Sequence, residues 1–482
     1  MESKALNIAY IGGGSRGWAW TFMKDLALEA ELGGVIKLYD IDVAAASCNE
    51  MIGNRISALA DAKGKWRYQV SGSLEEAVTE ADFIIISIMP GNFKHMHSDV
   101  HLPERLGIYQ AVGDTAGPGG IIRSLRTVPA FVRFAEAIRD YAPDAWVINY
   151  TNPMSLCIRT LYHVFPGIKA FGCCHEVFGM QALLAVMAER KLGIEGIKRR
   201  EIEVNVLGIN HFTWFDRAYY AKSREPIASF AVPPGDAVDL MEMYREFVDE
   251  FYETGFETDS SHLPDRCFSS NNRVKFDLFR RFGWMAAAGD RHLAEFMPGS
   301  DYLLNPETAE RWGFYLTSVD WRMKDLEARL RKSRRLVNGE DEIRLNPSGE
   351  EGIMLIKALC GLYDVKSNVN LPNALKQIAN LPSETVVETN ALFTYDSVKP
   401  VMAGELSDEI FALTEPHFRN QTEVLDAALG CDREAVYRAF GRDPLVGHRP
   451  EAELRKLADD MIANTRDCLP EGWQIAYTLI EK

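Results

Sequence analysis

The feature that most limits the fold of this chain is a short glycine-rich turn between an apolar segment and a helical one. Residues 7–11 are an apolar run, residues 12–17 are the turn, and helical periodicity continues from residue 18 to residue 32. This order predicts a strand, a tight turn and a helix. The turn reads Gly-Gly-Gly-Ser-Arg-Gly, which fits the pattern G-x-G-x-x-G. Such a unit is typical of the first strand of a doubly wound sheet.

Further apolar runs continue this pattern through the first 200 residues. They span residues 35–39, 82–88, 145–150 and 168–171, with helical stretches between them. Nearly continuous apolar runs of this length indicate buried parallel strands. We therefore predict an α/β fold in which residues 1–200 form a Rossmann domain. An alternating strand at residues 202–208, followed by long helical segments, predicts an α+β second domain over residues 201–482.

The glycine turn predicts a dinucleotide site. Glycines let the backbone approach a pyrophosphate, whose charge is favoured by the helix N-terminus. Asp40 ends the second strand, 23 residues beyond Gly17, where it can bind a ribose hydroxyl, which favours NAD over NADP. A glycine-rich turn also occurs without a nucleotide, so this prediction depends on the complete strand, turn, helix and acidic residue. The residues predicted to bind NAD are Gly12, Gly14, Ser15, Arg16, Gly17 and Asp40.

The charge of the chain argues against nucleic acid or an anionic membrane as the main partner. The 482 residues carry a formal net charge of −16, and the resulting field repels polyanions. No apolar run approaches the roughly 20 residues that a membrane helix needs. The first residues lack the basic and apolar parts of a signal peptide. The eight cysteines have no regular spacing, as expected for free thiols. We expect a cytoplasmic protein that acts on a small molecule.

Three polar segments follow predicted strands on the side of the sheet where the cofactor should bind. They are residues 151–153, with Asn152, residues 173–179, with Cys174, and residues 208–211, with His211. An asparagine there can bridge the nicotinamide ribose and a substrate hydroxyl, and thiolate and imidazole suit a divalent transition metal. Packing also explains a single cysteine or histidine at a strand end. The spacing between Cys174 and His211 is not by itself a metal signature.

Taken together, these segments resemble the NAD- and manganese-dependent glycosidases of glycoside hydrolase family 4. The resemblance covers residues 7–215 and rests on the glycine turn, residues 113–120, Arg123, Arg126, Asn152-Pro153, Cys174-His175 and Asn210-His211. This family is an exception to the two-carboxylate rule of glycosidases. It implies a lactate-dehydrogenase-like second domain and assembly as a homodimer or homotetramer. It also implies a redox-assisted elimination, in which NAD takes hydride from C3 of the sugar and later returns it.

The resemblance also implies roles for individual residues. Cys174 and His211 would ligate the metal, and Asn152 would hold sugar hydroxyls near it. His175 is a candidate acid for the leaving oxygen, and support of the metal is its alternative role.

The base that removes the C2 proton is harder to assign. Residues 289–296 lie where related enzymes place it, and Asp290 is the first choice, with His292 the second. Either residue could equally be a helix cap or a packed histidine.

The residues after Cys174, together with residues 289–296, look most like the α-galacturonidases, which release galacturonic acid from pectin fragments. An anionic substrate needs a local cation, for which Arg291, Arg266 and Lys94 are candidates, although solvation explains each of them as well. Family 4 enzymes that cleave α-glucosides, α-galactosides or α-glucuronides stay open as alternatives. A 2-hydroxy-acid dehydrogenase, which would need a Gly-x-His-Gly loop that we do not find, and an inactive NAD-sensing or scaffold protein are alternatives from other classes.

Overall fold

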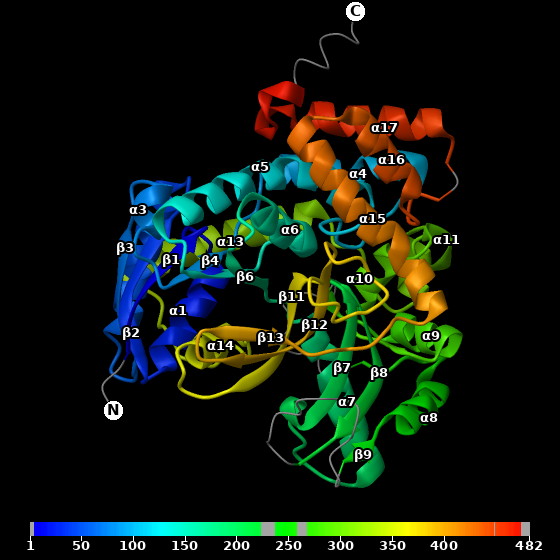
Figure 1. The fold of residues 1–482 in the computed structure, drawn as a ribbon, viewed down its shortest axis with the longest axis horizontal. Helices are drawn as coiled ribbons and strands as arrows, with labels where there is room; N and C mark the ends of the chain where they lie inside the picture. Colours follow the sequence, from blue (N-terminus) through cyan, green and yellow to red (C-terminus); the bar gives the residue numbers. More distant parts are fainter. Residues whose placement is uncertain (1–3, 223–236, 258–267, 448, 474–482) are drawn as a thin grey trace, which may run out of the picture.

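A computed structural model describes residues 4–222, 237–257, 268–447 and 449–473. Within these ranges the largest element is a nine-stranded sheet in the order β13-β12-β11-β6-β5-β4-β1-β2-β3 (Figure 1). The first six strands run parallel in the Rossmann order. They are β1 (Lys4–Ile11), β2 (Leu32–Tyr39), β3 (Lys65–Val70), β4 (Phe83–Ile86), β5 (Trp146–Asn149) and β6 (Lys169–Gly172). The predicted Rossmann fold is confirmed, with β3 as an addition.

Alternate side chains of the parallel strands are buried on opposite faces of this sheet. In β4, Ile84 and Ile86 face one hydrophobic cluster, whereas Phe83 and Ile85 face another. The first cluster includes residues of α3 (Leu74–Val78), α5 (Gly117–Tyr141) and α6 (Met154–Val164), and the second includes residues of α1 (Trp18–Leu28), α2 (Val43–Ser57), α13 (Val319–Asn338) and α14 (Gly352–Leu359). Burial on both faces explains why these strands are apolar at almost every position. It leaves the sheet's edge as the place for polar chemistry.

A smaller antiparallel sheet begins near the predicted domain boundary. Strands β7 (Ile202–Ile209) and β8 (Phe212–Tyr220) form a hairpin with the two-residue loop Asn210-His211. Strands β9 (Val238–Asp239) and β10 (Met285–Ala286) pair with β8. Side chains of the hairpin pack against α7 (Glu176–Leu192), α8 (Met241–Phe251), α9 (Arg273–Phe282), α10 (Asp290–Glu295) and α15 (Asp408–Gly430).

The last helices of the described chain cover two helices that lie between β4 and β5 in the chain. Figure 1 shows α15, α16 (Arg433–Arg442) and α17 (Glu451–Thr465), in orange and red, close to α4 (Phe93–His101) and α5. The short helices α11 (Gly299–Tyr302) and α12 (Pro306–Arg311) lie between α10 and α13 in the chain. None of the described helices is both long enough and apolar enough to cross a membrane.

Strands from the second half of the chain extend the first sheet. They are β11 (Val365–Pro372), β12 (Val386–Thr394) and β13 (Ser397–Pro400). β11 pairs antiparallel with β6 at Asn370 and Gly172, and with β12 along its whole length. Residues 1–200 therefore do not hold the complete sheet, although we predicted a division there. Pairing between segments so far apart leaves no local pattern in the sequence, because the partner strand is not a neighbour along the chain.

We predict that Gly12→Ala destabilises the protein. Gly12 has a φ of 94°, and an added Cβ would lie 2.0 Å from the carbonyl oxygen of Ser87. The left-handed backbone alone costs alanine about 1–2 kcal/mol, and the close contact adds to this cost. Urea denaturation followed by circular dichroism should show the lower free energy of unfolding.

The matched control is Gly179→Ala in α7, where an added Cβ meets no atom within 4 Å. This change should raise the free energy of unfolding by about 0.5–1 kcal/mol, because alanine loses less backbone entropy in a helix. Equal effects of the two substitutions would contradict the prediction.

Candidate active site at the carboxyl edge of the sheet

The predicted site segments meet at one edge of the sheet. The glycine turn follows β1, Asn152 follows β5 and Cys174 follows β6. The hairpin loop between β7 and β8 adds His211, and α10 adds His292. The rings of His211 and His292 stack with their centroids 3.8 Å apart. Segments from both halves of the chain therefore contribute to one site.

Hydrogen bonds with the side chains of Asp40 and Asn49 hold the glycine turn in place. The N–H of Gly14 donates to the Asp40 carboxylate over 2.8 Å. Asn49 Nδ2 donates to the carbonyl oxygens of Gly13 and Ser15 over 2.7 and 2.9 Å. Asp40 thus has a structural contact in addition to its predicted role at the ribose, since a carboxylate can accept several hydrogen bonds.

Apolar side chains are exposed around this turn. Trp18, Ile41 and Met89 follow β1, β2 and β4, and they are 40%, 93% and 41% exposed. The three side chains follow neighbouring strands, so a ligand bound at the glycine turn could cover them. Arg16 lies at the same end of the sheet and pairs with Asp42 at 3.7 Å. These features fit the predicted dinucleotide site.

Trp18 also connects the glycine turn with the cysteine segment. Its ring lies 5.9 Å from the ring of His175 and 5.6 Å from that of Tyr150. The side chain of His175 is 51% exposed, and its Nδ1 lies 3.6 Å from Glu350 Oε1. An exposed imidazole beside the cofactor turn can reach a bound ligand, as its predicted role as an acid requires.

A hydrogen-bond relay sets the tautomer of His211. Thr115 Oγ1 donates to Asp114 Oδ1 over 2.8 Å, so its oxygen is left to accept from His211 Nδ1, 3.0 Å away. With Nδ1 protonated, Nε2 keeps its lone pair. Burial lowers the pKa of His211 to about 3, so the ring is neutral at pH 7. This is the state in which an imidazole binds a metal ion.

Two further side chains lie close to His211. Asp114, His211 and His292 offer ligand atoms that are all within 4.8 Å of one another. Burial alone would raise the pKa of Asp114, but His292 and His211 lower it, so the carboxylate is ionised. The Asp114 carboxylate and the neutral His211 imidazole are donors that suit manganese and other divalent transition metals. The residues present therefore fit a divalent metal.

Cys174 is buried beside the hairpin loop. Its side chain is within hydrogen-bond reach of Asn210, and Asn368 Nδ2 donates to its backbone carbonyl over 3.3 Å. Burial, together with Glu388 and Glu176, raises the pKa of the Cys174 thiol well above its usual value. A bound cation would reverse this effect, because a coordinated thiol is deprotonated. Cys174 is not part of the group within 4.8 Å that surrounds His211.

His292 is oriented by Glu176, the first residue of α7. Glu176 Oε2 accepts the N–H of Gly289 over 2.7 Å, and its Oε1 lies 3.7 Å from His292 Nε2. Burial alone would raise the pKa of Glu176, but His292 and His175 lower it to about 2. Burial lowers the pKa of His292, so this ring is neutral at pH 7. Its Nδ1 is buried and has no hydrogen-bond partner among the described residues.

The side chain of Asn152 offers one hydrogen-bond acceptor to a ligand. Its Nδ2 donates to Asp114 Oδ2 over 3.3 Å, whereas its Oδ1 is buried without a partner in the described ranges. Arg123 Nε holds the backbone carbonyl of Asn152 at 3.2 Å. An unpaired buried oxygen costs about 1–3 kcal/mol, and a sugar hydroxyl could remove this cost by donating to it.

Asp290, our first choice for the base, caps a helix instead of facing the other site residues. Its fully buried carboxylate accepts the N–H groups of Val274 and Lys275 over 3.3 and 3.2 Å. Lys275 Nζ lies 3.8 Å away. These contacts hold the first turn of α9, where a negative charge stabilises the helix. The geometry therefore favours His292, the second choice.

The three cations predicted for the substrate carboxylate have different surroundings. Arg291 follows Asp290 in α10, and its guanidinium donates over 3.0 Å to a backbone carbonyl of the loop that precedes Asp114. Lys94 is exposed on α4, near Asp467. Arg266 lies outside the described residues.

Sequence reasoning assigned no role to Asp114, Thr115, Glu176 or Glu388. The first two lie in residues 113–120, and Glu176 lies two residues after Cys174, so both segments were recognised without these roles. Glu388 lies on β12, and nothing near it in the sequence indicates a site. Burial raises the pKa of the Glu388 carboxyl to about 7.

Comparison with known proteins decides the family. Residues 7–190 match the model of the family 4 glycosyl hydrolases, and residues 206–446 match that of the family 4 glycosyl hydrolase C-terminal domain. This chain belongs to glycosyl hydrolase family 4. The predicted resemblance is confirmed, and a 2-hydroxy-acid dehydrogenase is the weaker interpretation.

Individual members of family 4 match almost the whole chain. An α-galacturonidase of Lachnoclostridium phytofermentans is 55% identical over 471 residues, which cover 98% of each chain. A crystal structure of a candidate glucosidase from Bacillus subtilis is 47% identical, with a TM-score of 0.87, and covers 95% of this chain and 99% of that one. A 6-phospho-α-glucosidase from gut microorganisms, solved with NAD and Mn²⁺, is 20% identical with a TM-score of 0.79, and covers 97% of this chain and 100% of that one. At that identity it shows a shared fold.

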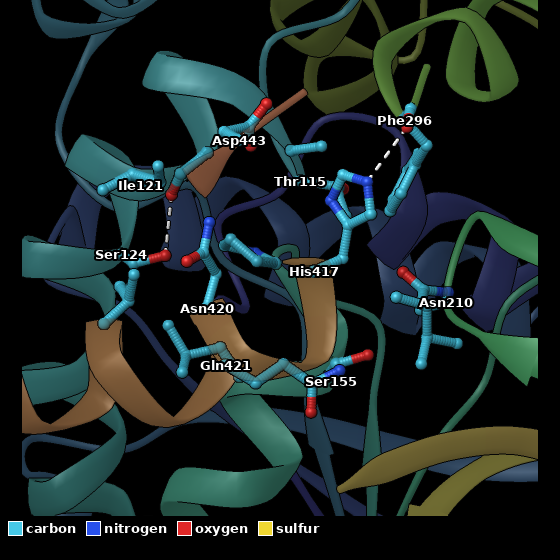
Figure 2. Close-up of a pocket in the computed structure, with 16 residues that line it drawn as sticks. Thr115, Ile121, Ser124, Ser155, Asn210, Phe296, His417, Asn420, Gln421 and Asp443 are labelled. Atoms are coloured by element: carbon cyan, nitrogen blue, oxygen red, sulfur yellow. Dashed lines mark hydrogen bonds between the residues drawn. The ribbon is translucent and has the colours of Figure 1, made fainter. Parts of the chain in front are cut away.

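A small cavity of this family 4 protein lies between α5, α6 and α15, next to Thr115 and Asn210 (Figure 2). Its volume is about 60 Å³, which is room for a few water molecules and much less than the roughly 300–1,000 Å³ of a typical ligand pocket. Figure 2 shows His417 beside the cavity, and its Nε2 lies 3.0 Å from the carbonyl oxygen of Phe296. The cavity is therefore a packing feature beside the site.

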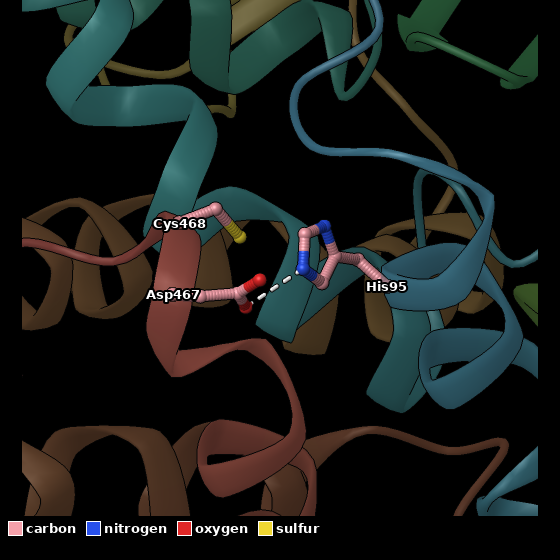
Figure 3. A group of neighbouring side chains, drawn as sticks. All are labelled: His95, Asp467 and Cys468. Carbon is pink, nitrogen blue, oxygen red and sulfur yellow. Dashed lines mark hydrogen bonds and ion pairs between the residues drawn. The ribbon is translucent and has the colours of Figure 1, made fainter.

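A second group of metal-type side chains does not have the chemistry of a metal centre. His95, Asp467 and Cys468 lie within 4.8 Å of one another (Figure 3). The N–H of Asn92 donates to His95 Nδ1 over 3.0 Å, so Nε2 carries the proton and donates to Asp467 over 2.8 Å. The Cys468 thiol donates to the Thr465 carbonyl over 3.0 Å, and burial raises its pKa to about 11. The group binds the end of α17 to α4 through hydrogen bonds.

We predict that His417 makes the protein less stable at acidic pH. Burial lowers its pKa from 6.5 to about 4, although the hydrogen bond to Phe296 opposes this shift. Between these values the unfolded chain binds a proton that the folded chain does not, so the free energy of unfolding falls as the pH falls. His417 alone should contribute up to about 1.4 kcal/mol per pH unit to this slope. Urea denaturation at several values from about pH 7 to about pH 4, where histidine titrates, would measure this slope.

His417→Gln should flatten this slope, because glutamine does not titrate. His97, exposed on α4, gives the matched control His97→Gln, which should leave the slope unchanged. His211 and His292 keep part of the slope, because burial lowers their pKa values as well. The prediction is wrong if the slope in His417→Gln is as steep as in the unchanged protein.

Proposed function

We propose that this protein is an NAD- and manganese-dependent α-galacturonidase of the cytoplasm, assembled as a homodimer or homotetramer. The observation that carries the proposal is the neutral His211, which keeps a lone pair on Nε2 and lies in one group of possible ligands with Asp114 and His292. The sugar class is supported by the name of the 55% identical relative, and the cofactors by the related structure with NAD and Mn²⁺. The assembly and the location rest on the family resemblance.

The glycine turn would hold the dinucleotide. The N-terminus of α1 would face the pyrophosphate, and Asp40 would bind the ribose. The exposed Trp18, Ile41 and Met89 would be covered by the bound cofactor. The residues of the turn in this role are Gly12, Gly14, Ser15, Arg16 and Gly17.

His211 and Cys174 would hold the metal, with Asp114 as the nearest carboxylate. When bound, the dinucleotide supplies a hydride acceptor and the metal supplies a Lewis acid beside the sugar hydroxyls. Both serve the same cleavage, because an oxidised C3 makes the proton on C2 easier to remove.

The chain's own residues would move the protons. Asn152 Oδ1 would accept a sugar hydroxyl, and His292 Nδ1 would take the proton from C2 while Glu176 keeps the other ring nitrogen turned toward itself. His175 would donate a proton to the leaving oxygen. Arg291 is our proposal for the sugar carboxylate, with Lys94 and Arg266 as the further candidates.

One prediction of this proposal concerns the cofactors and the metal ligands. With an α-galacturonide, NAD, Mn²⁺ and a reductant, the protein should cleave the glycoside without accumulating NADH. Cys174→Ser and His211→Ala should each lower kcat by more than about 100-fold, because losing a ligand costs more than losing its outer support. The matched controls are Cys48→Ser on α2 and His97→Ala on α4, which should keep full activity.

Two outcomes would contradict this function. Stoichiometric NADH would indicate a dehydrogenase, and cleavage that survives removal of both NAD and metal would exclude the mechanism. A panel of α-glucosides, α-galactosides, α-glucuronides and α-galacturonides, ranked by kcat/KM, tests the sugar.

Another prediction of this proposal separates the two candidates for the base. His292→Gln should lower kcat by about 10²–10⁴-fold, the usual contribution of a general base, with a smaller change in KM. Asp290→Asn should lower the free energy of unfolding by about 1–3 kcal/mol through weaker capping of α9, and the folded protein should keep its kcat. Asp290 would be the base if the two kcat results were reversed.

A further inference from the structure

Glu388 is a buried carboxylate whose position in the chain is remote from every predicted site residue. It lies on β12 and is 1% exposed. Its Oε1 accepts Asn368 Nδ2 over 2.7 Å, its Oε2 accepts Asn210 Nδ2 over 3.2 Å, and Asn370 is within hydrogen-bond reach. A buried carboxylate raises the free energy of the folded state unless such donors satisfy it. The three side-chain amides therefore compensate for the burial of Glu388.

The amides that bind Glu388 also contact the segments proposed to hold the metal. Asn368 Nδ2 donates both to Glu388 and to the backbone carbonyl of Cys174. Asn210 directly precedes His211, and its side chain is within hydrogen-bond reach of the Cys174 thiol. Through these two amides, one carboxylate connects the loop after β6 with the loop between β7 and β8.

The strands behind these contacts have a fixed register. Asn370 and Glu388 are directly opposite in the antiparallel pair of β11 and β12, and Asn370 is also the residue of β11 that pairs with β6. Cys174 follows β6 by two residues. Glu388 is thus carried by rigid backbone next to the loop of Cys174, and it can hold that loop at a set distance from the hairpin.

We propose that Glu388 is a positioning residue for the metal site, where it keeps Cys174 Sγ and His211 Nε2 at the separation that a divalent transition metal requires. This inference rests on the proposed function. Glu388 acts through Asn210 and Asn368 and does not touch the substrate. Outer residues of this kind set metal affinity by fixing the orientation of the ligands.

The experiment uses Co²⁺ as the probe, because a cobalt–thiolate bond gives a near-ultraviolet charge-transfer band that reports ligation by Cys174. In Glu388→Gln the side chain keeps its shape, but one oxygen becomes an NH₂ group that opposes the asparagine donors. We expect Co²⁺ to bind about 10–100-fold more weakly, with a reduced band. NAD affinity, measured by calorimetry on the same protein, should stay within twofold, a change of roughly 0.4 kcal/mol or less.

The matched control is Thr389→Val, the next residue on β12. Thr389 is buried, and its hydroxyl has no hydrogen-bond partner in the described part of the chain, so valine removes no contact there. Co²⁺ affinity and the band should stay as in the unchanged protein. A purely structural role of Glu388 would lower the free energy of unfolding and leave both cobalt readouts unchanged in the folded protein.

Asn368→Ala keeps the proposal testable if Glu388→Gln does not fold. It leaves the carboxylate in place but removes the amide shared with Cys174, so Co²⁺ should bind about 10-fold more weakly. If both variants fold, their effects on Co²⁺ affinity should be less than additive, because both break the same connection.

The outcomes distinguish this inference from the proposed function. If the unchanged protein shows no charge-transfer band and Cys174→Ser binds Co²⁺ equally well, the proposed metal site is wrong. If the unchanged protein shows the band, and Glu388→Gln and Asn368→Ala bind Co²⁺ with the same affinity and spectrum, the positioning role is overturned. Weaker binding in both variants with unchanged NAD affinity supports it.

Discussion

The parallel pairing of β1 to β6 is the constraint on which the rest of this structure depends. Parallel strands need crossovers, the crossovers bury both faces of the sheet, and only the edges remain for polar groups. The glycine turn, Asn152 and Cys174 all follow strands of this sheet, so the topology alone brings them to one edge. The second sheet then adds His211 from a hairpin loop, where its backbone φ of 64° lies in the left-handed region that few residues other than glycine adopt.

Hydrogen bonds determine which histidine of this protein can bind a metal. His211 donates through Nδ1 to Thr115, which leaves Nε2 with a lone pair. His95 accepts through Nδ1 from a backbone N–H, so its Nε2 carries the proton. Both histidines have an acidic residue and further donors nearby. The two histidines differ in which ring nitrogen carries the hydrogen, and the distances to neighbouring side chains do not by themselves reveal this.

The second half of the chain does more than supply a substrate domain. Its strands β11 and β12 join the first sheet beside β6 and bring Asn368 into contact with the loop of Cys174, with Asn370 and Glu388 next to it on the same strands. Burying one carboxylate among three amides makes this contact specific, since an unsatisfied charge in the same place would be strongly unfavourable. The site is thus supported from behind by residues that are far from it in the sequence.

Local patterns in the sequence determined the Rossmann topology, the glycine turn with Asp40, and the order of Asn152, Cys174 and His211 along the chain. Each depends on neighbouring residues: periodicity, glycine spacing and the ends of apolar runs. The family resemblance then joined segments whose spacing carried no signal of its own. Only the tertiary structure shows that Asp290 caps α9, because a carboxylate that caps a helix and one that faces a substrate have the same local sequence. It alone revealed the relay from Asp114 to His211 and the place of Glu388, since these contacts join residues that chain order keeps apart.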